Sequence, residues 1–269
     1  MGEILGLGLT HYPPLIGLDA NMANILRAVL KDPGLPERYR DSASWPEPMR
    51  REYGTDGATA SAAAHRADLV RHFRNARTLL DDFRPDVVVM CGDDQHENFT
   101  EDIIPPFCVL AYDEVEARHR PRDASNVWGE GPDTVFRIKG HREAGKYLAG
   151  RLLEQGVDMA YAYKPLHHQG LAHAFLNTVL YLDYDRIGFP YPVVAFQVNC
   201  YGRRVIAQRG GRGSLAHPLA RGLDGGQQEM LNWYMLAGAM EALGRKPDTC
   251  EFLETWSFNS NKCFAVFQP

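Results

Sequence analysis

The sequence predicts an α/β fold, with a single domain built on a mainly parallel central sheet flanked by helices. Short apolar runs bounded by turn residues alternate with longer segments of helical periodicity along the 269 residues. Helices interleaved with buried strands typically build layered sheets of this kind. Because the chain is long and 45% of its residues are hydrophobic, it can bury one large core, and we expect one domain over residues 1–269.

Six apolar runs are expected to be strands, because each is short and is followed by turn residues. They are residues 4–9, 87–91, 107–112, 159–163, 193–198 and 263–267. Three segments have the periodicity of amphipathic helices, namely residues 59–83, 140–155 and 227–243. The chain therefore begins and ends with a strand and places helices between most of the others.

Two stretches have neither the apolar runs expected of strands nor the periodicity expected of helices. Residues 32–58 are rich in proline, glycine and charge, and we expect an excursion, such as a lid, between the first strand and the long helix. Residues 201–226 are rich in glycine and are expected to form a loop. Loops at strand ends carry many catalytic residues, so the second stretch is a candidate for part of a site.

The composition limits which partners the protein is expected to bind and in which cellular compartment it is expected. A net charge of -5 gives no general attraction to nucleic acid or to an anionic membrane. The five cysteines are odd in number and form no CxxC pair, so neither a disulfide framework nor a thiolate zinc site is expected. Nowhere is there the run of about 18 apolar residues that a membrane span requires. We therefore expect a cytoplasmic protein that binds no nucleic acid and no membrane.

His11 is the first candidate for chemistry. It follows the first predicted strand in the sequence GLTHYPPL, where two prolines stiffen the turn. Open α/β sheets bind ligands at the carboxyl ends of their strands, although a histidine that closes a turn is also a common structural feature. Other polar groups stand at predicted strand ends or on helix faces, namely residues 91–99 (CGDDQHENF), 167–170 (HHQG), 215–218 (LAHP) and Glu229.

Together these segments resemble the class III extradiol ring-cleaving dioxygenases, the superfamily of the protocatechuate 4,5-dioxygenase catalytic subunit. The resemblance is carried by residues 10–15 (THYPPL), 102–108 (DIIPPFC) and 229–233 (EMLNW), whose order and spacing are more specific than any one of them. It implies Fe(II) held by two histidines and one carboxylate, with open positions for a catecholate and for dioxygen.

The resemblance assigns the metal ligands only in part. His11 matches the first histidine and Glu229 matches the carboxylate. Counting back without a gap from the PPF segment places Gln95 at the second histidine, and a neutral amide is a weaker ligand for Fe(II) than imidazole. Either His96 reaches the metal by a one-residue shift, or His65 near the start of the long helix substitutes, or the site binds metal poorly.

Two further histidines match positions that act on protons or line the pocket. His217 matches the second-sphere histidine of the family, and an imidazole with a pKa near 6.5 can give or take a proton near neutral pH. The family's Asp-His-Gly turn appears here as HQG, so His168 takes its histidine's place if the turn carries one extra residue. We predict His217 and His168 as catalytic residues.

Three neighbours receive smaller roles. Asp94 is a candidate for orienting a ligand imidazole from outside the metal's own shell. We expect His167 and His173 to be structural neighbours of the site. A carboxylated substrate would need a cation, for which Arg203, Arg204 and Arg212 are candidates.

The implied reaction is extradiol cleavage of a catechol-type ring, in which both atoms of dioxygen are inserted beside the diol. The partners would be a small aromatic substrate and dioxygen, in a homo-oligomer that in some members includes a small separate subunit. Two other functions stay open, a catalytically divergent metal-dependent enzyme and a silent binding subunit of the same superfamily. Stoichiometric metal uptake would separate the silent subunit from both enzymes.

Overall fold

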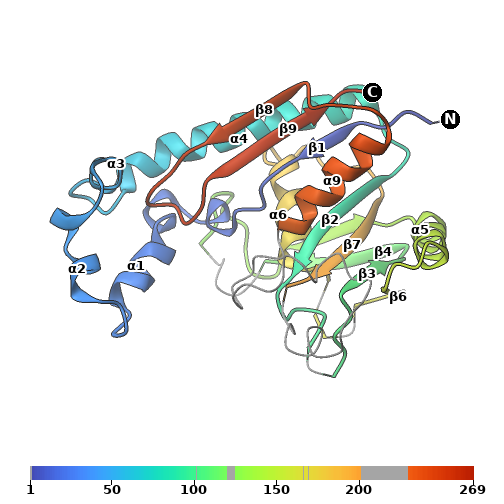
Figure 1. Ribbon diagram of the computed structural model, residues 1–269, viewed down its shortest axis with the longest axis horizontal. Helices are drawn as coiled ribbons and strands as arrows, with labels where there is room; N and C mark the ends of the chain where they lie inside the picture. Colours follow the sequence, from blue (N-terminus) through green and yellow to red (C-terminus); the bar gives the residue numbers. More distant parts are fainter. Residues whose placement is uncertain (1, 101, 120–124, 166, 169, 201–229) are drawn as a thin grey trace.

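Helices and three β-sheets form an α/β fold (Figure 1). The computed structural model describes residues 2–100, 102–119, 125–165, 167–168, 170–200 and 230–269. The strands are β1 (Gly6–Gly8), β2 (Val88–Asp94), β3 (Phe107–Leu110), β4 (Glu114–Arg118), β5 (Val135–Lys139), β6 (Ala160–Ala162), β7 (Val193–Asn199), β8 (Thr249–Leu253) and β9 (Lys262–Phe267). The α-helices are α1 (Asn24–Lys31), α2 (Glu37–Arg40), α3 (Glu47–Tyr53), α4 (Thr59–Phe83), α5 (Arg142–Glu154), α6 (His173–Leu182) and α9 (Met230–Ala242).

The largest sheet has four strands in the order β2-β7-β3-β6 and is mixed. β2 runs parallel to β7 and β3 runs parallel to β6, but β3 and β7 are antiparallel. The prediction of a mainly parallel sheet is therefore wrong at this pair. The described part of the segment between β2 and β3 contains no helix. A parallel return normally needs a helical crossover, and here the chain simply turns back.

Helices α6 and α5 cover opposite faces of this sheet. Alternation along β7 places Val193 and Ala195 in the core beside α6, whereas Val194 and Phe196 belong to the cluster beside α5. The contact with α6 is close, since a Cβ atom at Gly92 would lie only 2.9 Å from the Phe175 ring. The amino-terminal turn of α6 therefore lies directly on β2, next to the end of that strand.

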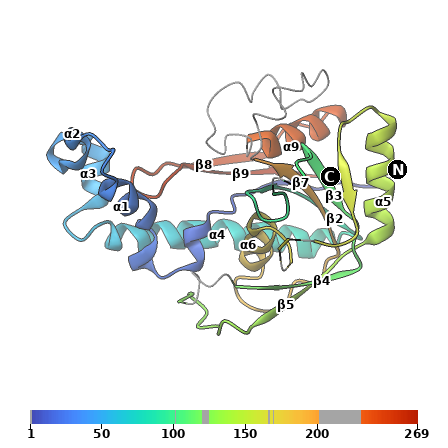
Figure 2. The ribbon, with the colours of Figure 1, turned by 90° about the horizontal axis from the view of Figure 1, so that it is seen from below.

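The antiparallel sheet β1-β9-β8 lies between α4 and α9 (Figures 1 and 2). Phe264 of β9 packs against Phe73 of α4, with ring centroids 5.5 Å apart, and the next residue, Ala265, joins the cluster formed with α9. On β1, a Cβ atom at Gly8 would lie 2.3 Å from the Trp233 ring of α9, so only glycine fits there. This packing fixes the end of β1, from which the chain continues to His11.

The six predicted strands and three predicted helices all occur, with small shifts at their ends. Residues 32–58 contain the short helices α2 and α3, which lie with α1 at one end of the molecule in both views (Figures 1 and 2). Residues 201–226 and the first three residues of the helix predicted from 227 lie outside the described residues. Among the described helices, none combines the length and the apolarity that crossing a bilayer requires.

Lys262 at the start of β9 is buried, with a relative exposure of 1%. Its ammonium group donates to the carbonyls of Phe258, at 2.5 Å, and Ser260, and it lies 3.8 Å from the centroid of the Tyr12 ring. Burial lowers the pKa of Lys262 to about 7, against the raising influence of the Glu52 carboxylate. The folded protein therefore holds this proton less tightly than the unfolded chain does.

This shift predicts a pH-dependent stability. Between a pKa of about 7 in the folded state and 10.5 in the unfolded state, the unfolded chain binds more protons, so stability rises with pH. From about pH 7.5 to about pH 9.5, the free energy of unfolding of the wild type should gain about 2.5 kcal/mol relative to Lys262→Met. Urea unfolding across this range measures the gain. Lys246→Met, at an exposed lysine, is the control, and parallel profiles for wild type and Lys262→Met would contradict the prediction.

Candidate metal centre

His11 from the loop after β1, Asp93 from β2 and His173 from the start of α6 come together. One ligand atom from each lies within 4.8 Å of the other two. Nε2 of His11 is 3.3 Å from Oδ1 of Asp93, and Nε2 of His173 is 4.0 Å from Oδ2 of the same carboxylate. Within the described ranges, this is the one group of three or more His, Cys, Asp or Glu side chains close enough to share an ion.

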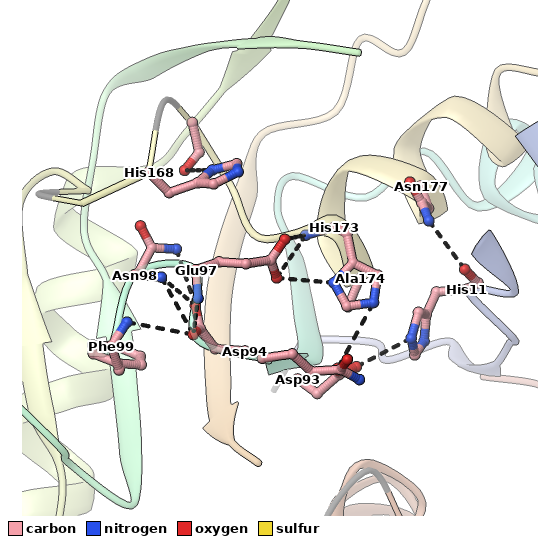
Figure 3. A network of polar contacts seen from close by, with 12 residues as sticks. His11, Asp93, Asp94, Glu97, Asn98, Phe99, His168, His173, Ala174 and Asn177 are labelled. Carbon is pink, nitrogen blue, oxygen red and sulfur yellow. Dashed lines mark hydrogen bonds and ion pairs between the residues drawn. The ribbon is translucent and has the colours of Figure 1, made fainter. Parts of the chain in front are cut away.

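Local structure explains how Asp93 reaches the group. Asp93 and Asp94 end the buried strand β2, and both have a relative exposure of 0%. The Asp94 carboxylate accepts hydrogen bonds from the backbone N–H groups of Glu97, Asn98 and Phe99, which folds the following turn around it. Asp93 instead extends toward the two histidines (Figure 3). Because successive strand residues point to opposite sides, Asp94 bonds the turn while Asp93 joins His11 and His173.

The two oxygens of Asp93 have different surroundings. Oδ2 accepts a hydrogen bond from Nε2 of Gln95 at 2.9 Å. Oδ1 is buried and accepts no hydrogen bond from the described residues, and Nε2 of His11 lies 3.3 Å from it. A buried carboxylate oxygen without a partner is costly, and a bound cation would remove that cost. The residues present therefore fit a metal ion.

Glu97 holds the third member of the group in place. The His173 backbone N–H donates to Oε1 of Glu97 at 3.1 Å, and Nδ1 of the His173 ring lies 2.8 Å from Oε2 (Figure 3). A carboxylate at the amino terminus of α6 is also favoured by the helix dipole. A proton on Nδ1 would be held by this carboxylate, so Nε2, which faces Asp93, is the nitrogen that could bind a metal ion.

Charge at the site favours a cation. Burial raises the pKa of the Asp94 carboxyl, against hydrogen bonds from Asn98 and Phe99 that lower it. Asp93 and Glu97 add two more carboxyl groups within the same turn. Two imidazoles and one carboxylate form the ligand set typical of non-haem Fe(II) oxygenases, which keep open positions for substrates. Imidazole and carboxylate also suit zinc and manganese, so the ligand set alone does not fix the metal.

Of the predicted metal ligands that the structure describes, His11 lies in the group and the two others lie away from it. His11 belongs to the group, whereas His96 is exposed in the turn after β2 with a φ of 58°. His65 is buried on α4 and stacks on Phe258, with ring centroids 4.8 Å apart. Burial lowers the pKa of His65 to about 4, so its ring is neutral near pH 7. Neither His96 nor His65 is part of the group, and their role as ligands stays a prediction.

The predicted catalytic residues are only partly described. His168 is half-buried in the loop before α6, and its Nδ1 lies 3.4 Å from the carbonyl oxygen of Gly170. In Figure 3 it stands on the Glu97 side of the network, away from His11. His217, and Glu229, which was predicted as a metal ligand, lie outside the described residues.

Two members of the group were not predicted as ligands. His173 was expected to be a structural neighbour, and Asp93 received no role beside Asp94. A signal for Asp93 was present, because two consecutive acidic residues at the end of a buried strand require a reason to be there. His173 gave a weaker signal, as the first residue of a ten-residue apolar segment.

No protein-family model matches the chain. A partial similarity links it to the 2,3-dihydroxyphenylpropionate/2,3-dihydroxicinnamic acid 1,2-dioxygenase of Rhodococcus jostii (strain RHA1), 30% identical over 107 residues, which are 40% of this chain and 30% of that protein. A second links it to 2,3-dihydroxyphenylpropionate/2,3-dihydroxicinnamic acid 1,2-dioxygenase 2 of Pseudomonas putida, 30% identical over 128 residues, which are 47% of this chain and 35% of that protein. The chain thus spans about a third of the length of the curated relatives it matches.

Proposed function

We propose that the chain is an Fe(II)-dependent extradiol dioxygenase of the class III superfamily, which opens the ring of a small catechol-type substrate with dioxygen. The observation that carries the proposal is the group of His11, Asp93 and His173, which lie after β1, at the end of β2 and at the start of α6. Partial similarity to two proteins named as dioxygenases supports the same class. We further propose that residues 1–269 form one domain and that the protein is a homo-oligomer.

In this proposal the chain's own residues build a rigid three-sided holder. His11 and His173 would each offer a neutral imidazole nitrogen, and Asp93 would supply the negative charge. Glu97 keeps the proton of His173 on Nδ1, and Gln95 fixes the rotation of the Asp93 carboxylate. When bound, Fe(II) would supply the electron transfer that lets dioxygen react with an aromatic diol.

Proton transfers are assigned to histidines outside the holder. We propose that His217 takes the proton of the substrate hydroxyl and that His168 lines the pocket, since imidazole exchanges protons near neutral pH. Glu229 is the other candidate for the carboxylate ligand, and His96 and His65 are the other candidates for the second histidine. Asp93 and His173 are favoured over them because they already surround His11.

Oxygen uptake by protein purified without oxygen and loaded with Fe(II) tests the function. We expect consumption of about one dioxygen per catechol, together with the absorbance of a product cleaved beside the diol. His167→Ala, at a histidine outside the group, is the control and should retain this uptake. Bound iron without uptake on any catechol would contradict the proposed reaction, and a protein that takes up no metal would favour the silent binding subunit.

One observation favours a divergent enzyme as the second candidate. Gln95, which stands at the family's second histidine, donates to Asp93 and so supports a carboxylate in this part of the site. A holder of this composition suits other metal-dependent reactions, including hydrolysis or oxygenation of a non-catechol phenol. Stoichiometric metal together with turnover of such a substrate, and no turnover of catechols, would select this function.

A further inference from the structure

Helix α6 presents three polar residues at intervals of four. They are His173, Asn177 and Tyr181, and their relative exposures are 5%, 3% and 0%. Residues four apart lie above one another on the same side of an α-helix, so the three form one buried stripe. Apart from Thr178 the rest of the helix is apolar, which makes the stripe unusual for a helix in the core.

The whole stripe faces the segment that carries His11. Nδ2 of Asn177 donates to the His11 carbonyl oxygen at 3.2 Å, and the Tyr181 hydroxyl donates to the Tyr12 carbonyl oxygen at 2.7 Å. The His173 ring meets the His11 ring edge to face, with centroids 5.0 Å apart (Figure 3). A single rigid element therefore carries one imidazole and holds the backbone of the other.

The same segment is also held from its other side. The Tyr12 hydroxyl donates to the Met22 carbonyl oxygen at 2.9 Å, and the buried Lys262 ammonium lies over the Tyr12 ring. The backbone carbonyls of His11 and Tyr12 thus accept hydrogen bonds from α6. The Tyr12 side chain is held separately, by the Met22 carbonyl and the Lys262 ammonium. Buried backbone carbonyls need partners, and the side chains of α6 supply the one for His11 and add to the Leu15 N–H that the Tyr12 carbonyl also accepts.

We propose that α6 sets the spacing between the two imidazoles of the metal centre, and that Asn177 and Tyr181 are positioning residues for His11. The inference rests on the proposed metal centre and adds residues that touch neither metal nor substrate. Metal sites depend on ligand positions to a fraction of an ångström, so a shift of the His11 backbone should weaken binding. The stripe thereby links core packing to the chemistry of the site.

Cobalt(II) titration of the intact protein tests this inference without relying on turnover. Asn177→Leu removes the donor at similar volume, and we expect the Co²⁺ dissociation constant to rise by about 10-fold to 100-fold, the usual cost of losing a supporting contact. The visible absorption bands of bound Co²⁺ should also change, because they report ligand geometry. Tyr181→Phe should shift both readouts in the same direction by a smaller amount.

Thr178→Val is the matched control. It removes a hydroxyl from the same helix, where Thr178 donates to the Ala174 carbonyl at 2.7 Å, and should leave affinity and spectrum unchanged. If Asn177→Leu does not fold, Tyr181→Phe carries the test. Wild-type affinity and spectrum in a folded Asn177→Leu and in Tyr181→Phe would overturn the inference alone. Failure of the wild type to bind Co²⁺ would overturn both the inference and the proposed function.

Discussion

Asp93→Asn is expected to abolish stoichiometric metal binding. Asp93 is the charged member of the group and lies between both imidazoles, and asparagine keeps its shape while removing the charge. We expect the dissociation constant for Co²⁺ or Fe(II) to rise by at least about 100-fold, because a ligand is lost rather than a supporting contact. Calorimetric titration of the metal-free protein with the metal ion measures the change in the dissociation constant.

Glu229→Gln is the informative comparison for this variant, because the family resemblance assigns the carboxylate to Glu229. Tight binding by Asp93→Asn together with lost binding by Glu229→Gln would contradict the role of Asp93. Metal-free Asp93→Asn should unfold at the same temperature as the metal-free wild type or higher. The reason is that Oδ1 of Asp93 is buried and accepts no hydrogen bond within the part of the chain that the structure describes, so the carboxylate costs stability when no ion is bound.

Glu97→Gln is expected to weaken metal binding by about 10-fold to 100-fold without removing a ligand. The carboxylate makes the contact with Nδ1 that holds the His173 ring, and a neutral amide holds the proton there less strongly. Loss of its charge from the amino terminus of α6 should also cost about 1 kcal/mol of stability. Metal titration and urea unfolding measure the two effects separately.

Glu143→Gln separates the metal effect from the helix effect. Glu143 is also an acidic residue in the first turn of a helix, α5, but it is exposed and lies outside the candidate metal centre. We expect Glu143→Gln to lower stability slightly and to leave metal affinity unchanged. Equal metal affinities for Glu97→Gln and Glu143→Gln would show that Glu97 does not support His173.

Much of the fold could be predicted from the sequence because its signals are local. The strands β1, β2, β3, β6, β7 and β9 are apolar runs, and α4 occupies the 25 residues that its periodicity predicts. The strands β4, β5 and β8 were missed because charged residues interrupt them and much of their surface is exposed. Such strands owe their structure to pairing with a neighbour, as β4 does with β5, and not to an apolar run.

Helix α6 was missed for the opposite reason. Its sequence, HAFLNTVLYL, is apolar on nearly every side, and nine of its ten residues are buried. A helix buried all round has no exposed polar face, so a short, mostly apolar segment of this kind cannot be told from a strand by periodicity. The antiparallel pairing of β3 with β7 was likewise hidden, since strand order depends on how the whole chain packs.

The candidate site was likewise predicted only where its signal is local in the sequence. His11 was predicted because a histidine directly after an apolar run and before two prolines is a local pattern. Asp93 and His173 were not, because their meeting depends on α6 lying over the end of β2. Gln95, at the position that the resemblance gives to the second histidine, left open which residue fills that place, and only the fold brings His173 next to His11.

Anomalous X-ray scattering from crystals grown with Fe(II) in the absence of oxygen tests the central claim most directly. Data collected on both sides of the iron absorption edge locate the ion without assumptions about its ligands. We expect one strong peak between Nε2 of His11, the Asp93 carboxylate and Nε2 of His173, at about 2.0–2.2 Å from each ligand atom. A peak at His96 or His65 without contact to Asp93 and His173 would contradict the proposed metal centre.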